Sequence, residues 1–195
     1  MKRIVSLPFT FLFLAASPAL AHTGGSHASG LVSGLLHPLF GTDHVLAMIA
    51  IGLLAFQSTG YRKPLTPLLF ILMMGLGAVA GLLQMGFPFA EQGILGSVIL
   101  LGAALAFGKH IHPAILLPFV ALFGISHGFA HGVEMPSAAS AALYFSGFLA
   151  ATALLIGAGY VAGETMTKLS RSLSSKLIRA AGLVISLSGF GLALT

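Results

Sequence analysis

The chain has 195 residues, of which 57% are hydrophobic, only 7% are charged and none is cysteine. Soluble domains carry about 25% charged residues, so this chain cannot build a water-exposed surface, and lipid must be its main solvent. The lack of cysteine excludes disulfides and thiolate metal sites, which leaves histidine, carboxylate, methionine and backbone groups as metal ligands.

The first 21 residues have the three-part pattern of a secretory signal peptide. Two basic residues come first, an apolar run extends to about Leu14, and small residues lead to Ala21. A short apolar run followed by an A-x-A site predicts cleavage after Ala21, and a retained first membrane helix is the alternative. Cleavage would make His22 the N-terminus, outside the cytoplasm, with residues 22–36 as a periplasmic leader.

The leader contains two histidines. With its free α-amine and its imidazole, His22 could chelate a metal ion in a six-membered ring, and His27 follows in the same Gly- and Ser-containing stretch. The alternative is a leader with two spare histidines. Capture of metal at His22 and His27 is therefore an expectation that the sequence leaves open.

Six later stretches are apolar enough to cross a bilayer as helices, which takes about 20 residues each. They are residues 41–56, 64–85, 93–107, 113–131, 137–162 and 177–194. The apolar segment 28–36 is short, and we expect a half-helix or an interfacial turn there. The sequence thus predicts an all-α, polytopic transmembrane helix bundle of about six spans over residues 37–195.

Basic residues occur in alternate loops of this layout. Seven of the nine Lys and Arg residues follow the signal peptide, and they are Arg62, Lys63, Lys109, Lys168, Arg171, Lys176 and Arg179. The positive-inside rule places their loops in the cytoplasm, and the mature N-terminus then lies outside, as the signal peptide also predicts. The net charge of +5 is thus assigned to topology in a bacterial inner membrane, and the expected partner is the lipid bilayer rather than nucleic acid.

The first polar cluster is the stretch HPLFGTDHVLAM, from His37 to Met48. Its proline can start a helix and its glycine allows a bend. If the segment is helical throughout, His37 and His44 share a face, with Met48 one turn further along. Asp43 points away from that face of a regular helix. It could ligate a metal only if the helix is broken; otherwise it could orient an imidazole.

The second polar cluster is the stretch HGFAHGVE, from His127 to Glu134. Its histidines are four residues apart and Glu134 is three residues beyond His131, so one helix face carries two imidazoles and a carboxylate. The two glycines form a small-residue stripe that would let another helix approach closely.

Both clusters lie at the outer ends of their predicted spans. Imidazole suits nickel, cobalt, copper and zinc, and ionisable groups at membrane depth face a cavity or each other. We therefore expect His44, His127 and His131 to share one metal ion. The expected ligands or immediate support are His37, Asp43 and Glu134.

Other chemistries remain as alternatives. Histidine pairs could relay protons. An intramembrane zinc enzyme is a second alternative, but no Glu follows His127 directly. Ser126 lies in a Gly-x-Ser-x-Gly pattern at residues 124–128, but that pattern falls inside a predicted membrane helix and not at the strand-to-helix turn that a nucleophile elbow needs. No phosphate-binding Gly-x4-Gly-Lys-Ser/Thr loop is present, so the sequence gives no sign of ATP hydrolysis and we expect gradient-driven transport. We do not expect an enzyme. His110 and His112 are expected to be ordinary loop residues, with an exit site as the alternative.

Together the two stretches resemble the HupE/UreJ family of nickel and cobalt permeases. The family pattern is a His, five residues and Asp-His, followed later by His-Gly-x-x-His-Gly-x-Glu. The resemblance extends to the leader, the chain length and about six spans, and it departs at Ser126, where the family has Phe.

The resemblance implies a secondary permease without a fixed cofactor, which takes up Ni²⁺ or Co²⁺, with Zn²⁺ as an alternative, often for hydrogenase or urease maturation. It also suggests the six residues named above as functional. The choice of metal, the coupling ion and a homo-oligomeric state are not decided by the sequence.

Overall fold

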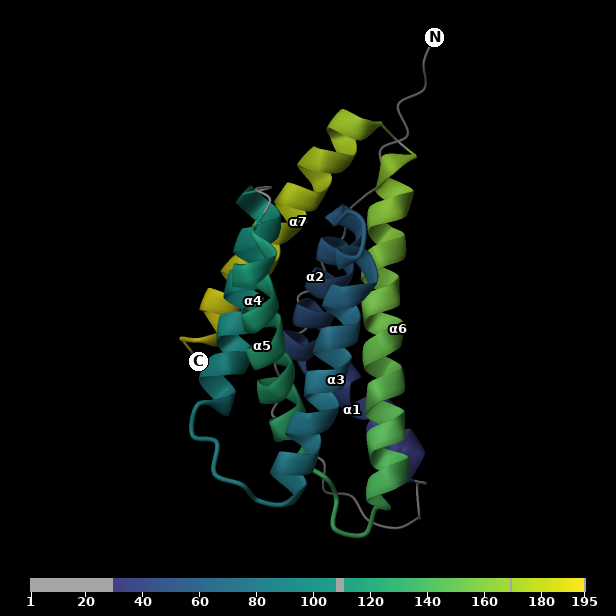
Figure 1. The fold of residues 1–195 in the computed structure, drawn as a ribbon, viewed down its shortest axis with the longest axis vertical. Coiled ribbons are helices and arrows are strands. Elements are labelled where there is room, and N and C mark those ends of the chain that lie inside the picture. Colours follow the sequence, from purple (N-terminus) through teal and green to yellow (C-terminus); the bar gives the residue numbers. More distant parts are fainter. Residues whose placement is uncertain (1–29, 108–110, 169, 195) are drawn as a thin grey trace.

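The structure is a computed structural model that describes residues 30–107, 111–168 and 170–194. Within these ranges the chain is all-α (Figure 1). The helices are α1 (Gly30–Phe40), α2 (Thr42–Gln57), α3 (Arg62–Leu82), α4 (Ala90–Phe107), α5 (Pro113–Val133), α6 (Ala141–Thr167) and α7 (Arg171–Leu192). The predicted signal peptide, His22, His27, Lys109 and His110 lie outside the described residues.

The helices α3 to α7 are each long and apolar enough to cross a membrane, and α1 and α2 together would make a sixth span that is bent by 84°. Large apolar side chains point away from the bundle, such as Leu72, Leu154 and Leu187, which are 59%, 70% and 67% exposed. Such a surface is stable against lipid tails and not against water. The predicted polytopic helix bundle is confirmed.

The first polar cluster is not one continuous helix. The chain breaks at Gly41, whose backbone is extended, between the end of α1 and the start of α2. A Cβ at Gly41 would lie 2.8 Å from Nδ1 of His44 and 3.0 Å from Oδ1 of Asp43. A residue with a side chain would therefore crowd these two groups, and glycine avoids this. The predicted bend is confirmed. The prediction that Pro38 starts a helix is wrong, because Pro38 is buried inside the last turn of α1.

Close helix pairs hold the bundle together. The helix α3 packs along α5, α4 along α7, and α6 along both α1 and α2. A Cβ at Gly128 of α5 would collide with the backbone carbonyl oxygen of Met74 on α3, and one at Gly34 of α1 with that of Tyr144 on α6. Gly132 approaches α3 in the same way, so the predicted small-residue stripe on α5 is confirmed.

The last helix begins earlier than the apolar pattern predicts. Ser170 caps α7 by accepting a hydrogen bond from a backbone N–H of its first turn, and the helix starts at Arg171. Lys176 and Arg179 therefore lie on a helix and not in a loop, which corrects the sequence prediction. Arg179 Nε donates to the carbonyl oxygen of Ala106 at 2.9 Å, which joins the start of α7 to the end of α4.

The two ends of the bundle differ in chemistry. The loops 83–89 and 134–140, which join α3 to α4 and α5 to α6, lie together at one end (lower in Figure 1). We call this the histidine end, because both polar clusters reach it. Every Lys and Arg in the described ranges lies at or near the opposite end, as the alternate-loop pattern predicts.

Candidate metal site

Four histidines from three helices come together at the histidine end. His37 lies in the last turn of α1, His44 in the first turn of α2, and His127 and His131 on successive turns of α5. The ring centroid of His44 lies 4.6 Å from that of His127 and 4.7 Å from that of His131. The ring centroids of His37 and His131 are 4.9 Å apart. The bend at Gly41 therefore brings the two α1–α2 histidines to the α5 pair through tertiary packing.

Asp43 orients the His44 ring. Its Oδ1 atom accepts hydrogen bonds from the backbone N–H and from Nδ1 of His44, both at 2.8 Å. A carboxylate only accepts, so Nδ1 carries the ring proton and Nε2 carries the lone pair. That Nε2 atom is buried and has no hydrogen-bond partner among the described residues. Asp43 thus fixes which nitrogen of His44 is available to a metal ion.

Ser97 of α4 has the same effect on His127. The Ser97 hydroxyl donates its single hydrogen to the carbonyl oxygen of Ile94 at 2.6 Å, and its oxygen lies 2.9 Å from Nε2 of His127. The oxygen can therefore only accept from His127, which puts the ring proton on Nε2 and the lone pair on Nδ1. Nδ1 of His127 is buried and without a partner in the described part of the chain.

Both ring nitrogens of His131 are unpaired among the described residues. Neither Nδ1 nor Nε2 has a hydrogen-bond partner within the described ranges, and the residue is fully buried. Its ring stacks on Phe148 of α6 with centroids 4.7 Å apart and planes inclined by 21°. Unpaired buried polar atoms cost about 1–3 kcal/mol each, and they need an explanation such as an ion or a water.

A carboxylate joins this cluster from the end of α5. Nε2 of His37 lies 2.8 Å from Oε2 of Glu134, which is the residue that ends the helix. His37, His131 and Glu134 each place one ligand atom within 4.8 Å of the others, which is a spacing that could hold a metal ion. The donors of the two sequence clusters therefore meet in space.

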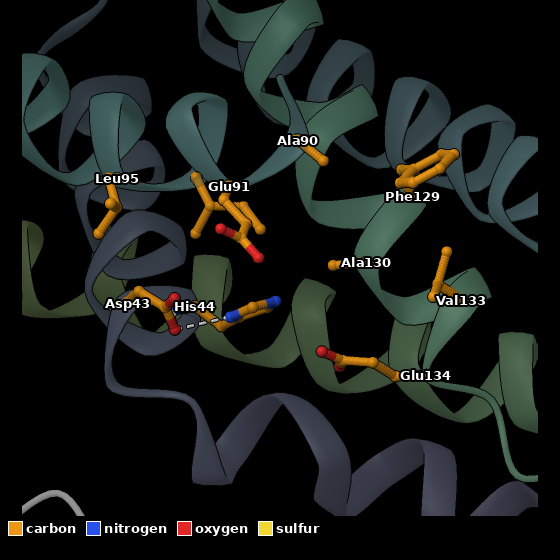
Figure 2. Close-up of a pocket in the computed structure, with 10 residues that line it drawn as sticks. Asp43, His44, Ala90, Glu91, Leu95, Phe129, Ala130, Val133 and Glu134 are labelled. Carbon is orange, nitrogen blue, oxygen red and sulfur yellow. Dashed lines mark hydrogen bonds and ion pairs between the residues drawn. The ribbon is translucent and has the colours of Figure 1, made fainter. Parts of the chain in front are cut away.

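A cavity of about 370 Å³ opens beside the histidines. Figure 2 shows the side chains of Glu91 and Glu134 extending into it toward the His44 ring. Asp43 also lines it, so three of the four acids of the chain lie here. Among the described residues, the ion pairs of Glu134 and Asp43 are with histidine and not with Lys or Arg. Carboxylates that line a cavity without a basic partner favour the entry of cations.

Two of these residues were not predicted from the sequence. Glu91, at the start of α4, had a usable signal, because it is one of only four acids and lies near the outer end of a predicted span. Ser97 had none, since a serine in an apolar membrane helix is ordinary. Its contact with His127 depends on how α4 packs against α5.

Two lesser sequence candidates lie elsewhere. Met48 is fully buried within the hydrophobic core, one turn beyond His44. His112 is exposed at the opposite end of the bundle, where it caps α5 by accepting a hydrogen bond from the backbone N–H of Ala114 at 3.3 Å. That contact gives His112 a local structural role.

The sequence profile of the HupE / UreJ protein family matches residues 10–192. The chain belongs to the HupE/UreJ family. This family comprises membrane transport and accessory proteins rather than enzymes, and its members are known from nickel and cobalt transport. The resemblance noted in the sequence is therefore confirmed.

One named relative is similar to this chain over almost its whole length. Protein HupE of Rhizobium leguminosarum bv. viciae is 35% identical over 185 residues, which cover 94% of this chain and 95% of that protein. No solved structure matches the chain.

Proposed function

We propose that this protein is a secondary permease that takes up a divalent transition-metal ion, Ni²⁺ or Co²⁺, across a bacterial inner membrane. The observation that supports this is the set of buried imidazole nitrogens without a hydrogen-bond partner in the described residues: Nε2 of His44, Nδ1 of His127 and both nitrogens of His131. A bound cation would satisfy lone pairs that are otherwise costly to bury.

The charges suggest the direction of transport. Carboxylates surround the cavity at the histidine end, and basic residues lie at the other end. The positive-inside rule then places the histidine end on the periplasmic side, with the mature N-terminus. The side chains of Glu134, His37 and His44 are 54%, 33% and 11% exposed, and His127 is fully buried. These donors form a graded path from the surface into the bundle.

The ion itself is the substrate in this proposal, so the site must also release it. Conduction requires binding that is strong enough to admit the ion and weak enough to let it leave. We expect modest affinity and partial metal content in purified protein. The membrane potential or a coupled ion would drive uptake, because the sequence carries no nucleotide-binding loop.

Uptake of radiolabelled Ni²⁺ and Co²⁺ into proteoliposomes tests the proposal, with Zn²⁺ and Mn²⁺ as competitors. We expect His44→Ala, His127→Ala and Glu134→Gln to reduce uptake to the protein-free background while the protein still inserts. Glu164→Gln is the matched control, because Glu164 is an exposed acid at the opposite end of α6. Wild-type rates in both histidine variants would refute the proposed function.

A further inference from the structure

The metal-ligating atoms of the cluster do not meet at a single point. His37, His131 and Glu134 form one convergent set, with ligand atoms within 4.8 Å of one another, and that set does not include His44 or His127. The lone pairs of His44 and His127 are the ones that Asp43 and Ser97 leave free. Two groups of donors therefore lie side by side, and His131 is in ring contact with members of both.

We propose that the cluster holds the transported cation at two successive positions. The outer position is formed by His37, Glu134 and His131, and the inner position by His44 and His127, with His131 passing the ion between them. This inference rests on the proposed function and gives that function its order of steps.

The two positions differ in chemistry. The outer position combines a carboxylate with imidazoles and is partly exposed, whereas the inner position is formed by buried imidazoles alone. At the outer position, Nε2 of His37 and Oε2 of Glu134 bond to each other at 2.8 Å, so they must separate to admit an ion. At the inner position the hydrogen bonds to Asp43 and Ser97 hold the proton of each ring on one nitrogen and leave the other nitrogen to an ion.

His131 is suited to serve both positions. Its ring is edge-on to those of His37 and His44, with centroids 4.9 and 4.7 Å away. Both of its nitrogens lack a partner among the described residues, unlike those of His44 and His127. A neutral imidazole has one lone pair and one N–H, so His131 can ligate at one position at a time. Because the two positions share His131, an ion at one of them is bound less tightly when it has to give up that ligand. Binding that is weak enough to be released favours onward movement of the ion.

Titration of the full-length protein in detergent with Co²⁺ tests this inference, because the visible absorption of Co²⁺ depends on its ligands. We expect Glu134→Gln to lose the carboxylate-containing spectrum and keep the imidazole spectrum. We expect His127→Ala to do the reverse, and the double variant to lose both. Each single variant should still bind Co²⁺ but fail to transport it, because positions in series are both required. Ser97→Ala is the milder inner-position variant if His127→Ala does not fold.

The outcomes separate the two hypotheses. If either single variant abolishes all Co²⁺ binding, or if both leave the same residual spectrum, the donors form one shared site and the two-position inference is wrong, while the permease proposal stands. If the wild-type protein binds neither Co²⁺ nor Ni²⁺ and does not transport them, the proposed function fails as well.

Discussion

Ser97 offers a sharp test of the proposed metal site, because it sets which nitrogen of His127 is free. Its hydroxyl oxygen accepts from Nε2 of His127 at 2.9 Å while its hydrogen is committed to the carbonyl oxygen of Ile94 at 2.6 Å. The variant Ser97→Ala removes the acceptor and leaves the backbone carbonyl in place. The His127 proton then has no reason to stay on Nε2.

The expected effect follows from burial. A buried N–H that loses its acceptor costs about 1–3 kcal/mol. Without Ser97 neither nitrogen of His127 has a hydrogen-bond partner among the described residues, so the proton is no longer held on Nε2 and can move to Nδ1, which is the nitrogen that would bind the ion. Loss of a hydrogen-bond partner behind a metal-ligating histidine typically weakens metal affinity about 10–100-fold. Such a loss corresponds to about 1.4–2.7 kcal/mol, which agrees with the first range. We therefore expect Ni²⁺ affinity to fall about 10–100-fold in Ser97→Ala.

Isothermal titration calorimetry with Ni²⁺ on the detergent-purified protein measures this change. Ser126→Ala is the matched control, because Ser126 is equally buried and adjacent to His127 in sequence, but its hydroxyl donates to the carbonyl oxygen of Leu122 at 2.9 Å. Ser97→Thr keeps the hydroxyl and should recover affinity. Wild-type affinity in Ser97→Ala, or an equal loss in Ser126→Ala, would refute the reasoning.

Three further predictions concern other parts of the molecule. Asp43→Asn keeps an oxygen that can accept from the adjacent imidazole but removes the charge, so we expect uptake to fall strongly while insertion is unchanged, and undiminished uptake would exclude a role for that charge. Gly128→Ala forces α3 and α5 apart and should destabilise the protein by about 1–3 kcal/mol, measured by thermal unfolding in detergent. Gly75→Ala is the control and should not destabilise the protein, because a Cβ there meets open space. Equal stability of the Gly128→Ala and Gly75→Ala variants would contradict the close approach of α3 and α5. A cysteine replacing Arg62 should resist a membrane-impermeant thiol reagent in intact cells, whereas one replacing Ser137 should react, and the opposite pattern would invert the topology.

The sequence alone determined the features that depend on local composition. Apolar content located the helices α2 to α6 to within a few residues, because a lipid-exposed helix must be apolar on nearly all sides. Helical periodicity placed His127 and His131 on one face of α5, since residues four apart are neighbours on any regular helix. The distribution of Lys and Arg predicted which loops share a side. These properties need no knowledge of how one helix meets another.

The tertiary structure decided which donors meet. The 84° bend at Gly41 turns α1 back so that His37 reaches His131 and Glu134 instead of extending the helix that carries His44. Glu91 and Ser97 enter the site from α4, and Phe148 from α6, through packing that no repeat in the sequence encodes. Glycines let the backbones of neighbouring helices touch and so hold the bundle together. A glycine in the sequence does not show which helix will pack against it. The donors of the two sequence clusters could therefore be predicted from the chain, whereas the contact of Ser97 and the geometry of the site arise only from the way the helices pack.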